Sequence, residues 1–177
     1  MTHMLNDRFY AGIGSRETPE NVLLVMELIA AKMCEKGWVL RSGGAPGADT
    51  AFENGLQISN NPNQKEIYLP WKGFNERTDT HKTFYGVCQK ALEIAEKFHP
   101  NWAACSDAAK KLHARNAYQI LGKSLDTPSD LVICWTKDGS GKGGTGQALR
   151  MAKHYGIRIH DLGIQTVFEK YKGRLEE

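Results

Sequence analysis

Three glycine-rich turns constrain the fold of this chain more than any other feature of its sequence. They span residues 12–16 (GIGSR), 42–47 (SGGAPG) and 139–146 (GSGKGGTG). Each follows a short apolar segment typical of a buried strand, and each precedes a segment with helical spacing of apolar residues. Strands that alternate with helices predict a mostly parallel sheet covered on both faces. The predicted fold class is therefore α/β, a Rossmann-like parallel sheet with helices on both faces.

The length and composition suit one soluble domain. The chain has 177 residues, of which 41% are hydrophobic and 24% charged, as is ordinary for a globular protein. We predict a single domain over residues 1–177, with residues 172–177 as a frayed tail. No apolar run approaches the roughly 20 residues that a membrane helix needs, and the N-terminus does not resemble a secretory signal. These features predict a cytoplasmic protein without a membrane partner.

The spacing of apolar and turn residues predicts the individual elements. Thr18 and Pro19 are expected as the cap and first residue of a helix that Gly37 closes. Strands are predicted at residues 8–14, 38–40, 65–71, 131–136 and 157–162. Further helices are predicted at residues 48–56, 79–98, 107–122, 147–155 and 165–171.

The cysteines and histidines do not have the spacing of a metal site. The four cysteines are far apart and form no CxxC pair, which favours buried thiols over zinc ligands or disulfides. The histidines also lack a metal-ligand pattern. We therefore predict neither a metal nor a cofactor. The residues considered are Cys34, Cys88, Cys105, Cys134, His81, His99, His154 and His160.

The same glycine-rich turns favour phosphate binding. Glycine allows close approach to the backbone, and the N-terminus of the following helix attracts anions. The third turn, Gly143–Gly146, has the strongest pattern, because Thr145 offers a hydroxyl and Lys142 a positive charge. It is not a Walker A loop, since the order GxxxxGK[ST] is absent. A tight turn without a ligand is the structural alternative.

Several side chains near these turns could contact a phosphorylated ligand. Arg16 could bind a phosphate or pair with a neighbouring glutamate, and Asp49 could bind a ribose or base or cap a helix. Arg115 and Asn116 belong to a polar group that could equally form a solvated helix face; its other members are His113 and Gln119.

Four segments together resemble the DprA/Smf DNA-processing family of the SLOG superfamily of Rossmann-like domains. They are GIGSRETP, LRSGGAPGADTAFENGL, ARNAYQILG and GGTGQALRMAKHYGIRIHDL, and their order covers nearly the whole chain. The resemblance implies a shared pocket, to which the turns themselves add Gly14 and Lys142. The pocket residues that it implies are Gly12, Ser15, Arg16, Gly43, Gly44, Gly47, Asp49, Arg115, Asn116, Gly143, Gly144, Thr145 and Gly146.

Three functions follow from the turns and the resemblance, and we rank them. The first, indicated by three phosphate-style turns without a convincing catalytic base, is binding of a nucleotide or a nucleotide-derived phosphate ligand, a role that also suits the small single-domain relatives found in bacteriophages. The second is hydrolysis of a nucleoside monophosphate, as in the LOG branch of the superfamily. That branch has the signature PGGxGTxxE, but Arg150 stands at the catalytic glutamate and Gln147 at the threonine. A permanent cation cannot act as a base, so a hydrolase would have to use Glu17, Glu53 or Glu76.

The third function is single-stranded DNA binding, as in DprA, which loads recombinase onto such DNA. DprA proteins usually carry extra domains, for which 177 residues leave no room, and the net charge of +3 is small for a dedicated DNA binder. The basic residues that would serve it are Arg16, Lys110, Lys111 and Arg115. The residues do not indicate any catalytic group, so enzymatic activity stays open. Since domains of this superfamily often pair, we also expect a homodimer.

Overall fold

The computed structural model describes residues 7–177 and follows the predicted alternation of strands and helices. The strands are β1 (Arg8–Gly12), β2 (Trp38–Ser42), β3 (Lys65–Leu69), β4 (Thr83–Tyr85), β5 (Leu131–Cys134) and β6 (Arg158–Asp161). The α-helices are α1 (Glu20–Glu35), α2 (Ala48–Gln57), α3 (Gln89–Lys97), α4 (Asp107–Leu121), α5 (Gly144–His154) and α6 (Gln165–Leu175). Short 3-10 turns occur at η1 (Phe74–Glu76), η2 (Trp102–Ala104) and η3 (Lys137–Gly139).

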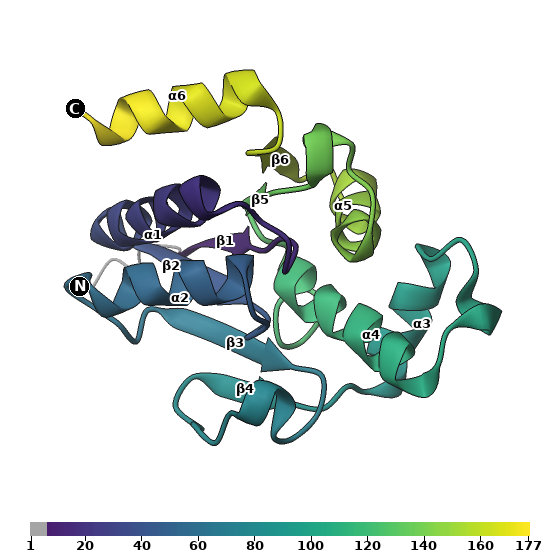
Figure 1. Cartoon of the computed structure of the whole chain (residues 1–177). Coiled ribbons are helices and arrows are strands. Elements are labelled where there is room, and N and C mark those ends of the chain that lie inside the picture. The colour runs from purple at the N-terminus through teal and green to yellow at the C-terminus, as the bar shows by residue number, and fades with distance from the viewer. Residues whose placement is uncertain (1–6) are drawn as a thin grey trace.

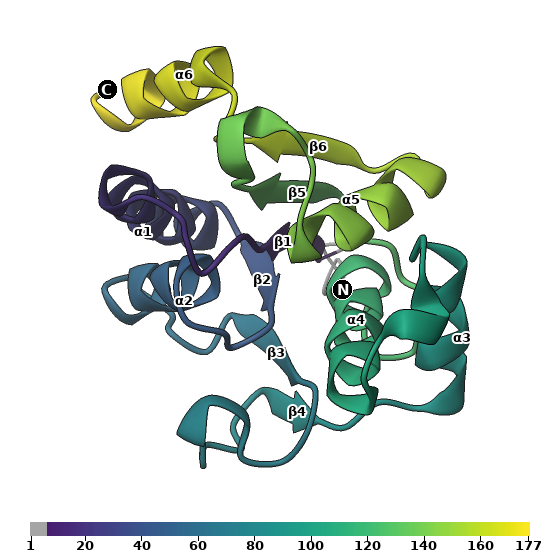
Figure 2. The ribbon, with the colours of Figure 1, turned by 45° about the vertical axis from the view of Figure 1, so that its right-hand side comes forward.

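The six strands within residues 7–177 form one parallel sheet in the order β4-β3-β2-β1-β5-β6. Helices α1, α2 and α6 cover one face, and α3, α4 and α5 cover the other (Figures 1 and 2). The predicted Rossmann-like α/β fold is confirmed.

The core is divided by the sheet into two layers. Along β1, Tyr10 belongs to the cluster under α1 and α2, whereas Ala11 belongs to the cluster under α4 and α5. Successive strand residues face opposite sides of a sheet, so a strand covered on both faces must be apolar throughout. All four residues of β5 are buried for this reason.

One predicted element is wrong. Residues 79–98 do not form a single helix but contain β4, a turn at Gly86 and the shorter helix α3. Phe84 stacks on Tyr68 of β3, with ring centroids 5.6 Å apart, and β4 pairs with β3 at the sheet edge. Gly86 then takes a φ of +90°, which an α-helix does not allow.

Smaller differences concern the ends of helices. Pro19 is the N-cap residue of α1 rather than its first helical residue, and Thr18 donates its hydroxyl to the Ser15 carbonyl at 2.6 Å. Helix α5 begins at Gly144, three residues earlier than predicted. Helix α6 continues to Leu175, so part of the predicted tail is helical; its fraying stays a prediction.

None of the helices within residues 7–177 has the length and apolar character needed to cross a membrane.

Candidate anion-binding site

The main cavity lies where the strand order of the sheet reverses. From β1 the chain adds β2 and β3 on one side, whereas β5 pairs with the other side of β1. The loops after β1 and β5 therefore diverge and leave a crevice at the carboxyl ends of the strands, the usual ligand position in open α/β sheets. We call this space the switch-point cavity. Its volume is about 1020 Å³.

Ten of the fifteen predicted site residues line the switch-point cavity. They come from the loop after β1, from α2, from α4 and from the start of α5, and so from segments far apart in sequence. These ten are Gly14, Ser15, Arg16, Asp49, Arg115, Asn116, Lys142, Gly143, Gly144 and Thr145.

Backbone amides at two of the turns have no partner among residues 7–177. In the loop after β1, the amides of Gly14, Ser15 and Arg16 make no intramolecular hydrogen bond within that range. At the start of α5, the same is true of Gly144 and Thr145. The first amides of a helix cannot bond within the helix, and its N-terminus carries a partial positive charge. These groups can therefore donate to an anion in the cavity.

The other five predicted glycines lie outside the cavity lining and serve packing. A Cβ atom on Gly12 would lie 2.7 Å from carbons of Leu40 and Phe52, and one on Gly146 would lie 2.5 Å from the Gly141 carbonyl oxygen. The remaining three are equally crowded: Gly43 against Arg115 and Gln119, Gly44 against Leu69 and Arg77, and Gly47 against Ser15 and Arg16. Their lack of a side chain lets protein segments approach one another.

Asp49 and Arg115 form the buried charged part of the site. Asp49 does not cap α2, because its carboxylate accepts a hydrogen bond from the Ala45 amide at 3.2 Å and so closes the second glycine turn. Burial raises the pKa of Asp49 to about 6, and the charge of Arg115 opposes this rise. Burial also lowers the pKa of Arg115, which Asp49 counteracts.

Arg115 is held in place by the protein itself. Its Nη1 donates to the carbonyl of Gly43 at 2.5 Å and, more weakly, to that of Tyr68 at 3.4 Å, while Nε donates to Asn116 Oδ1 at 3.3 Å. Asn116 in turn donates to Gln147 Oε1 at 3.1 Å. The guanidinium is fixed in the cavity wall between the second glycine turn and α5, and its Nη2 makes no hydrogen bond within residues 7–177.

Arg16 differs from Arg115 because it is exposed. It forms no ion pair within residues 7–177, so the predicted alternative of a bridge to a neighbouring glutamate is absent there. Lys137 and Lys142 lie on the opposite loop of the cavity. Positive side chains thus stand on both sides of the unpaired amides, together with the carboxylates Glu17, Asp49 and Asp138.

Thr136 and Asp161 hold the third glycine turn, and the sequence analysis missed both. Asp161 accepts hydrogen bonds from the Thr136 amide at 2.9 Å, from the Thr136 hydroxyl, and from the Gly163 amide at 2.9 Å. The Thr136 hydroxyl in turn accepts from the Gly141 amide at 2.9 Å. Thr136 is a polar residue at the end of an apolar segment, and this change of polarity was the sequence feature that could have indicated its role in the turn.

The carboxylates that a hydrolase would need are dispersed. Glu17 lines the switch-point cavity, whereas Glu53 and Glu76 do not. Glu53 is instead paired with Lys65 at 3.1 Å and with Arg77. Arg150 donates to the Phe98 carbonyl at 2.8 Å. A hydrolase would therefore depend on Glu17 or on a cavity carboxylate outside the predicted three.

The prediction of four buried thiols is wrong for two cysteines. Cys34 and Cys134 are buried, but Cys88 is exposed and Cys105 half-buried. Cys105 lies close to His99 and to His113, and His113 lines the cavity. Burial, followed by the charge of His99, lowers the pKa of His113 to about 4.

The fold and the cavity together define a Rossmann-like α/β protein with a ligand-sized crevice at the switch point of its sheet. No protein-family model and no curated protein matches the sequence. Among solved structures, the chain is similar to the Moco carrier protein of Chlamydomonas rheinhardtii, with 16% identity and a TM-score of 0.55. The similarity covers 96% of this chain and 84% of the carrier protein.

The chain is also similar to DNA processing protein A of Helicobacter pylori, a protein whose single-stranded DNA binding mode has been described. Here the identity is 19% and the TM-score 0.61, over 96% of this chain and 79% of that protein. The fold expected from the DprA resemblance is thus supported at the level of structure. Membership of the SLOG superfamily stays a prediction.

Proposed function

We propose that the switch-point cavity binds a phosphate-bearing small molecule of the nucleotide class. The observation that carries this proposal is the set of amides that have no partner within residues 7–177 on two turns lining the cavity, three after β1 and two at the start of α5. Amides that the protein's own carbonyls do not use are available to a ligand oxygen, and the α5 N-terminus adds a favourable potential. Arg16 and Lys142 supply exposed positive charges on the two sides.

The dimensions of the cavity support a ligand larger than phosphate alone. Small-molecule sites usually measure about 300–1,000 Å³, and the cavity is at the upper end of this range. The phosphate would contact the two turns, while Leu112 and Trp135 offer apolar surface to a ring. Arg115 and Asp49, held rigidly in the wall, would orient the polar groups between them.

The similarity to a Moco carrier protein agrees with a carrier or binding role for this fold. The cavity lining has several anion donors but, among residues 7–177, no paired nucleophile and base, which also agrees with binding as the main function. We therefore infer that the protein binds its ligand rather than transforming it.

Isothermal titration with AMP, ADP, cyclic nucleotides and inorganic phosphate tests the proposal. We expect at least one of the nucleotides to bind more tightly than phosphate, and Arg16→Gln to weaken that binding about tenfold, equivalent to about 1.4 kcal/mol. Arg16 is exposed and makes no ion pair among the described residues, so this variant should fold normally.

Arg158→Gln is the matched control. Arg158 is also exposed, but it begins β6 and so lies at the amino end of the parallel sheet, away from the cavity. Its substitution should leave binding unchanged. Absence of binding by every compound, or equal losses in the two variants, would argue against the site.

A second candidate function is single-stranded DNA binding. The similarity to DNA processing protein A favours it, and Lys110 and Lys111 lie on α4 between the cavity residues Ala109 and Leu112, although they do not line the cavity themselves. DNA binding through phosphate contacts must weaken steeply with salt, because it releases counterions. Fluorescence anisotropy with an oligonucleotide between 50 and about 200 mM salt tests this: about a tenfold loss or more supports DNA binding, whereas no salt dependence rejects it.

A further inference from the structure

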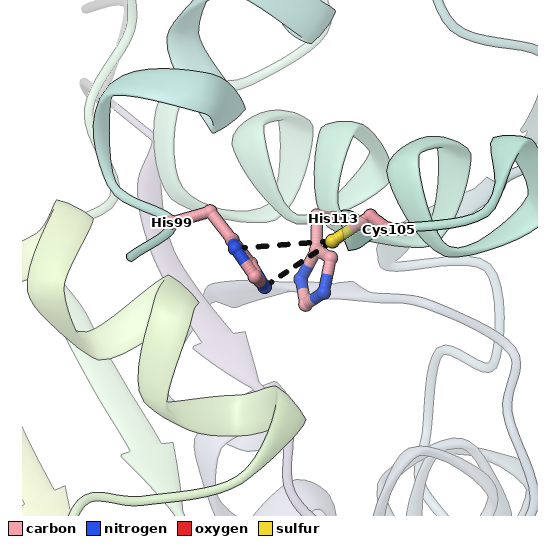
Figure 3. Close-up of side chains that lie close together, drawn as sticks. All are labelled: His99, Cys105 and His113. Carbon is pink, nitrogen blue, oxygen red and sulfur yellow. Dashed lines mark hydrogen bonds between the residues drawn. The ribbon is translucent and has the colours of Figure 1, made fainter. Parts of the chain in front are cut away.

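Three side chains with metal-binding atoms converge in the segment that joins α3 to α4. His99 lies two residues after α3, Cys105 directly follows η2, and His113 lies in the second turn of α4 (Figure 3). One ligand atom from each can be chosen so that no two are more than 4.8 Å apart. All three residues are half-buried.

The separation of Cys105 from His99 matches that between two ligands of a tetrahedral metal ion. Zinc binds thiolate sulfur at about 2.3 Å and imidazole nitrogen at about 2.0–2.1 Å, which puts sulfur and nitrogen about 3.6 Å apart at the tetrahedral angle. Cys105 Sγ lies 3.5 Å from His99 Nε2 and 3.8 Å from His99 Nδ1. Two ligand atoms at the 4.8 Å limit would have to close by about 1–1.5 Å to share one ion.

One ring nitrogen of this cluster has no hydrogen-bond partner in the part of the chain that the structure describes. The Nδ1 atom of His113 is buried and makes no hydrogen bond within residues 7–177. A buried polar atom without a partner costs free energy unless something binds it. The ring lies beside that of His99, with centroids 4.6 Å apart.

Metal binding by the other two side chains would break only weak or local hydrogen bonds. His99 Nδ1 accepts from the Asn101 amide at 3.0 Å, and the Cys105 thiol donates to the Asn101 carbonyl at 3.6 Å. Metal binding removes the thiol proton and with it the bond to the carbonyl. If His99 binds through Nε2, its proton moves to Nδ1 and the contact with the Asn101 amide is lost as well.

We propose that His99, Cys105 and His113 bind a zinc ion at the wall of the switch-point cavity. Two imidazoles and one thiolate are a ligand set that zinc prefers. Three protein ligands leave one coordination position open to water or to a ligand oxygen. Because His113 also lines the cavity, the ion is positioned to influence what binds there.

The local sequence explains why no spacing rule indicates this site. His99 and Cys105 are brought together by a turn at residues 99–105 that η2 closes, and His113 reaches them from the second turn of α4. Zinc motifs in sequence usually rely on short CxxC or HxxxH repeats, which this segment lacks.

Titration calorimetry with zinc alone, on protein first treated with a chelator, tests the proposal. We expect one equivalent to bind and about one proton to be released, because the thiol must ionise. Cys105→Ser and His99→Gln should each weaken binding more than tenfold, since loss even of an outer-shell partner costs about 10–100-fold. Cobalt provides a second measurement: a thiolate-to-cobalt absorption band should appear in the wild type and be absent from Cys105→Ser.

The matched controls are Cys88→Ser and His81→Gln, which replace exposed residues outside the cluster and should leave zinc affinity unchanged. Circular dichroism verifies folding, and the cobalt spectrum of the wild type reports thiolate ligation without any variant. Lack of saturable zinc binding, or undiminished binding in Cys105→Ser, would overturn the proposal. Zinc binding does not depend on the proposed phosphate ligand. Titrations with zinc alone and with the phosphate ligand alone therefore show separately whether the zinc proposal or the phosphate proposal fails.

Discussion

Asp49 gives the site a pH dependence that can be measured. Burial raises its carboxyl pKa to about 6, above the value of 3.8 expected without the fold. The folded protein therefore holds this proton more tightly than the unfolded chain does. The stability linked to it is fully present below about pH 4 and is lost as the pH rises through about 6.

Asp49→Asn should remove this dependence. Between pH 4 and 7 we expect the wild type to lose about 2 kcal/mol more unfolding free energy than the variant. His113, whose pKa burial lowers to about 4, acts in the opposite direction in both proteins and cancels in the difference. Urea unfolding at several pH values, with a chelator present, is the measurement. Parallel pH profiles for the two proteins would contradict the assignment.

Gly47 determines how closely the first and second glycine turns approach. Its φ of +88° and ψ of −125° suit glycine only, and a Cβ atom would lie 2.7 Å from the Ser15 carbonyl oxygen and 2.8 Å from the Arg16 Cα. Gly37 has a similar φ of +86° but open space around it.

Gly37→Ala should therefore cost about 1–2 kcal/mol from backbone conformation alone. Gly47→Ala should cost at least about 1 kcal/mol more, because the overlap displaces the first turn, and it should also weaken phosphate-ligand binding. Chemical denaturation and calorimetry measure the two effects. Equal stability losses for the two alanine variants would mean that the turns do not depend on this contact.

At the scale of elements, the third glycine turn depends on one carboxylate from another strand. Asp161, at the end of β6, accepts from Thr136 and Gly163 and is buried. Asp161→Asn would turn an NH2 group toward N–H or O–H donors and leave one of them unpaired. We expect a loss of about 2 kcal/mol and faster amide hydrogen exchange in residues 136–146.

Asp138→Asn is the control for this variant. Asp138 is exposed on the same loop, at a φ of +57°, and its carboxylate accepts no hydrogen bond within residues 7–177. Asparagine tolerates this backbone conformation, so stability and exchange should stay unchanged. Similar exchange rates for both variants would show that Asp161 does not hold the turn.

The sequence predicted elements well where local and tertiary preferences agree. Strand β5 is apolar throughout and α1 has a clear helical period, so both were found. The prediction of one helix over residues 79–98 was wrong because Phe84 and Val87 also fit a helical period by chance. The pairing of β4 with β3 and the stacking of Phe84 on Tyr68 decide the structure there, and contacts so distant leave no local pattern.

For the molecule as a whole, the sequence brought together residues that line one cavity but did not reveal the task of each. Topology puts the turns beside Arg16 and Asp49 at the carboxyl edge of the sheet, whereas Arg115 was implied by the DprA resemblance; all three line the cavity. The sequence could not distinguish the five glycines that serve packing from the glycines that line the cavity. Approach of a ligand and approach of another protein segment both require a residue without a Cβ atom.

The proposed zinc site left no pattern in the sequence for a related reason. Its three side chains come from a turn and a helix face whose relative positions depend on how α3 and α4 pack. The predicted homodimer is likewise a property of the surface as a whole, and sedimentation analysis tests it.

In the proposed complex, amides of two turns that have no partner within residues 7–177 hold the phosphate of the ligand. Amide chemical shifts during titration with AMP and with inorganic phosphate test it most directly. We predict saturable shifts, larger than elsewhere in the chain, at Gly14, Ser15, Arg16, Gly144 and Thr145. Shifts confined to other surfaces, or no shift at these five amides at saturating ligand, would contradict the claim.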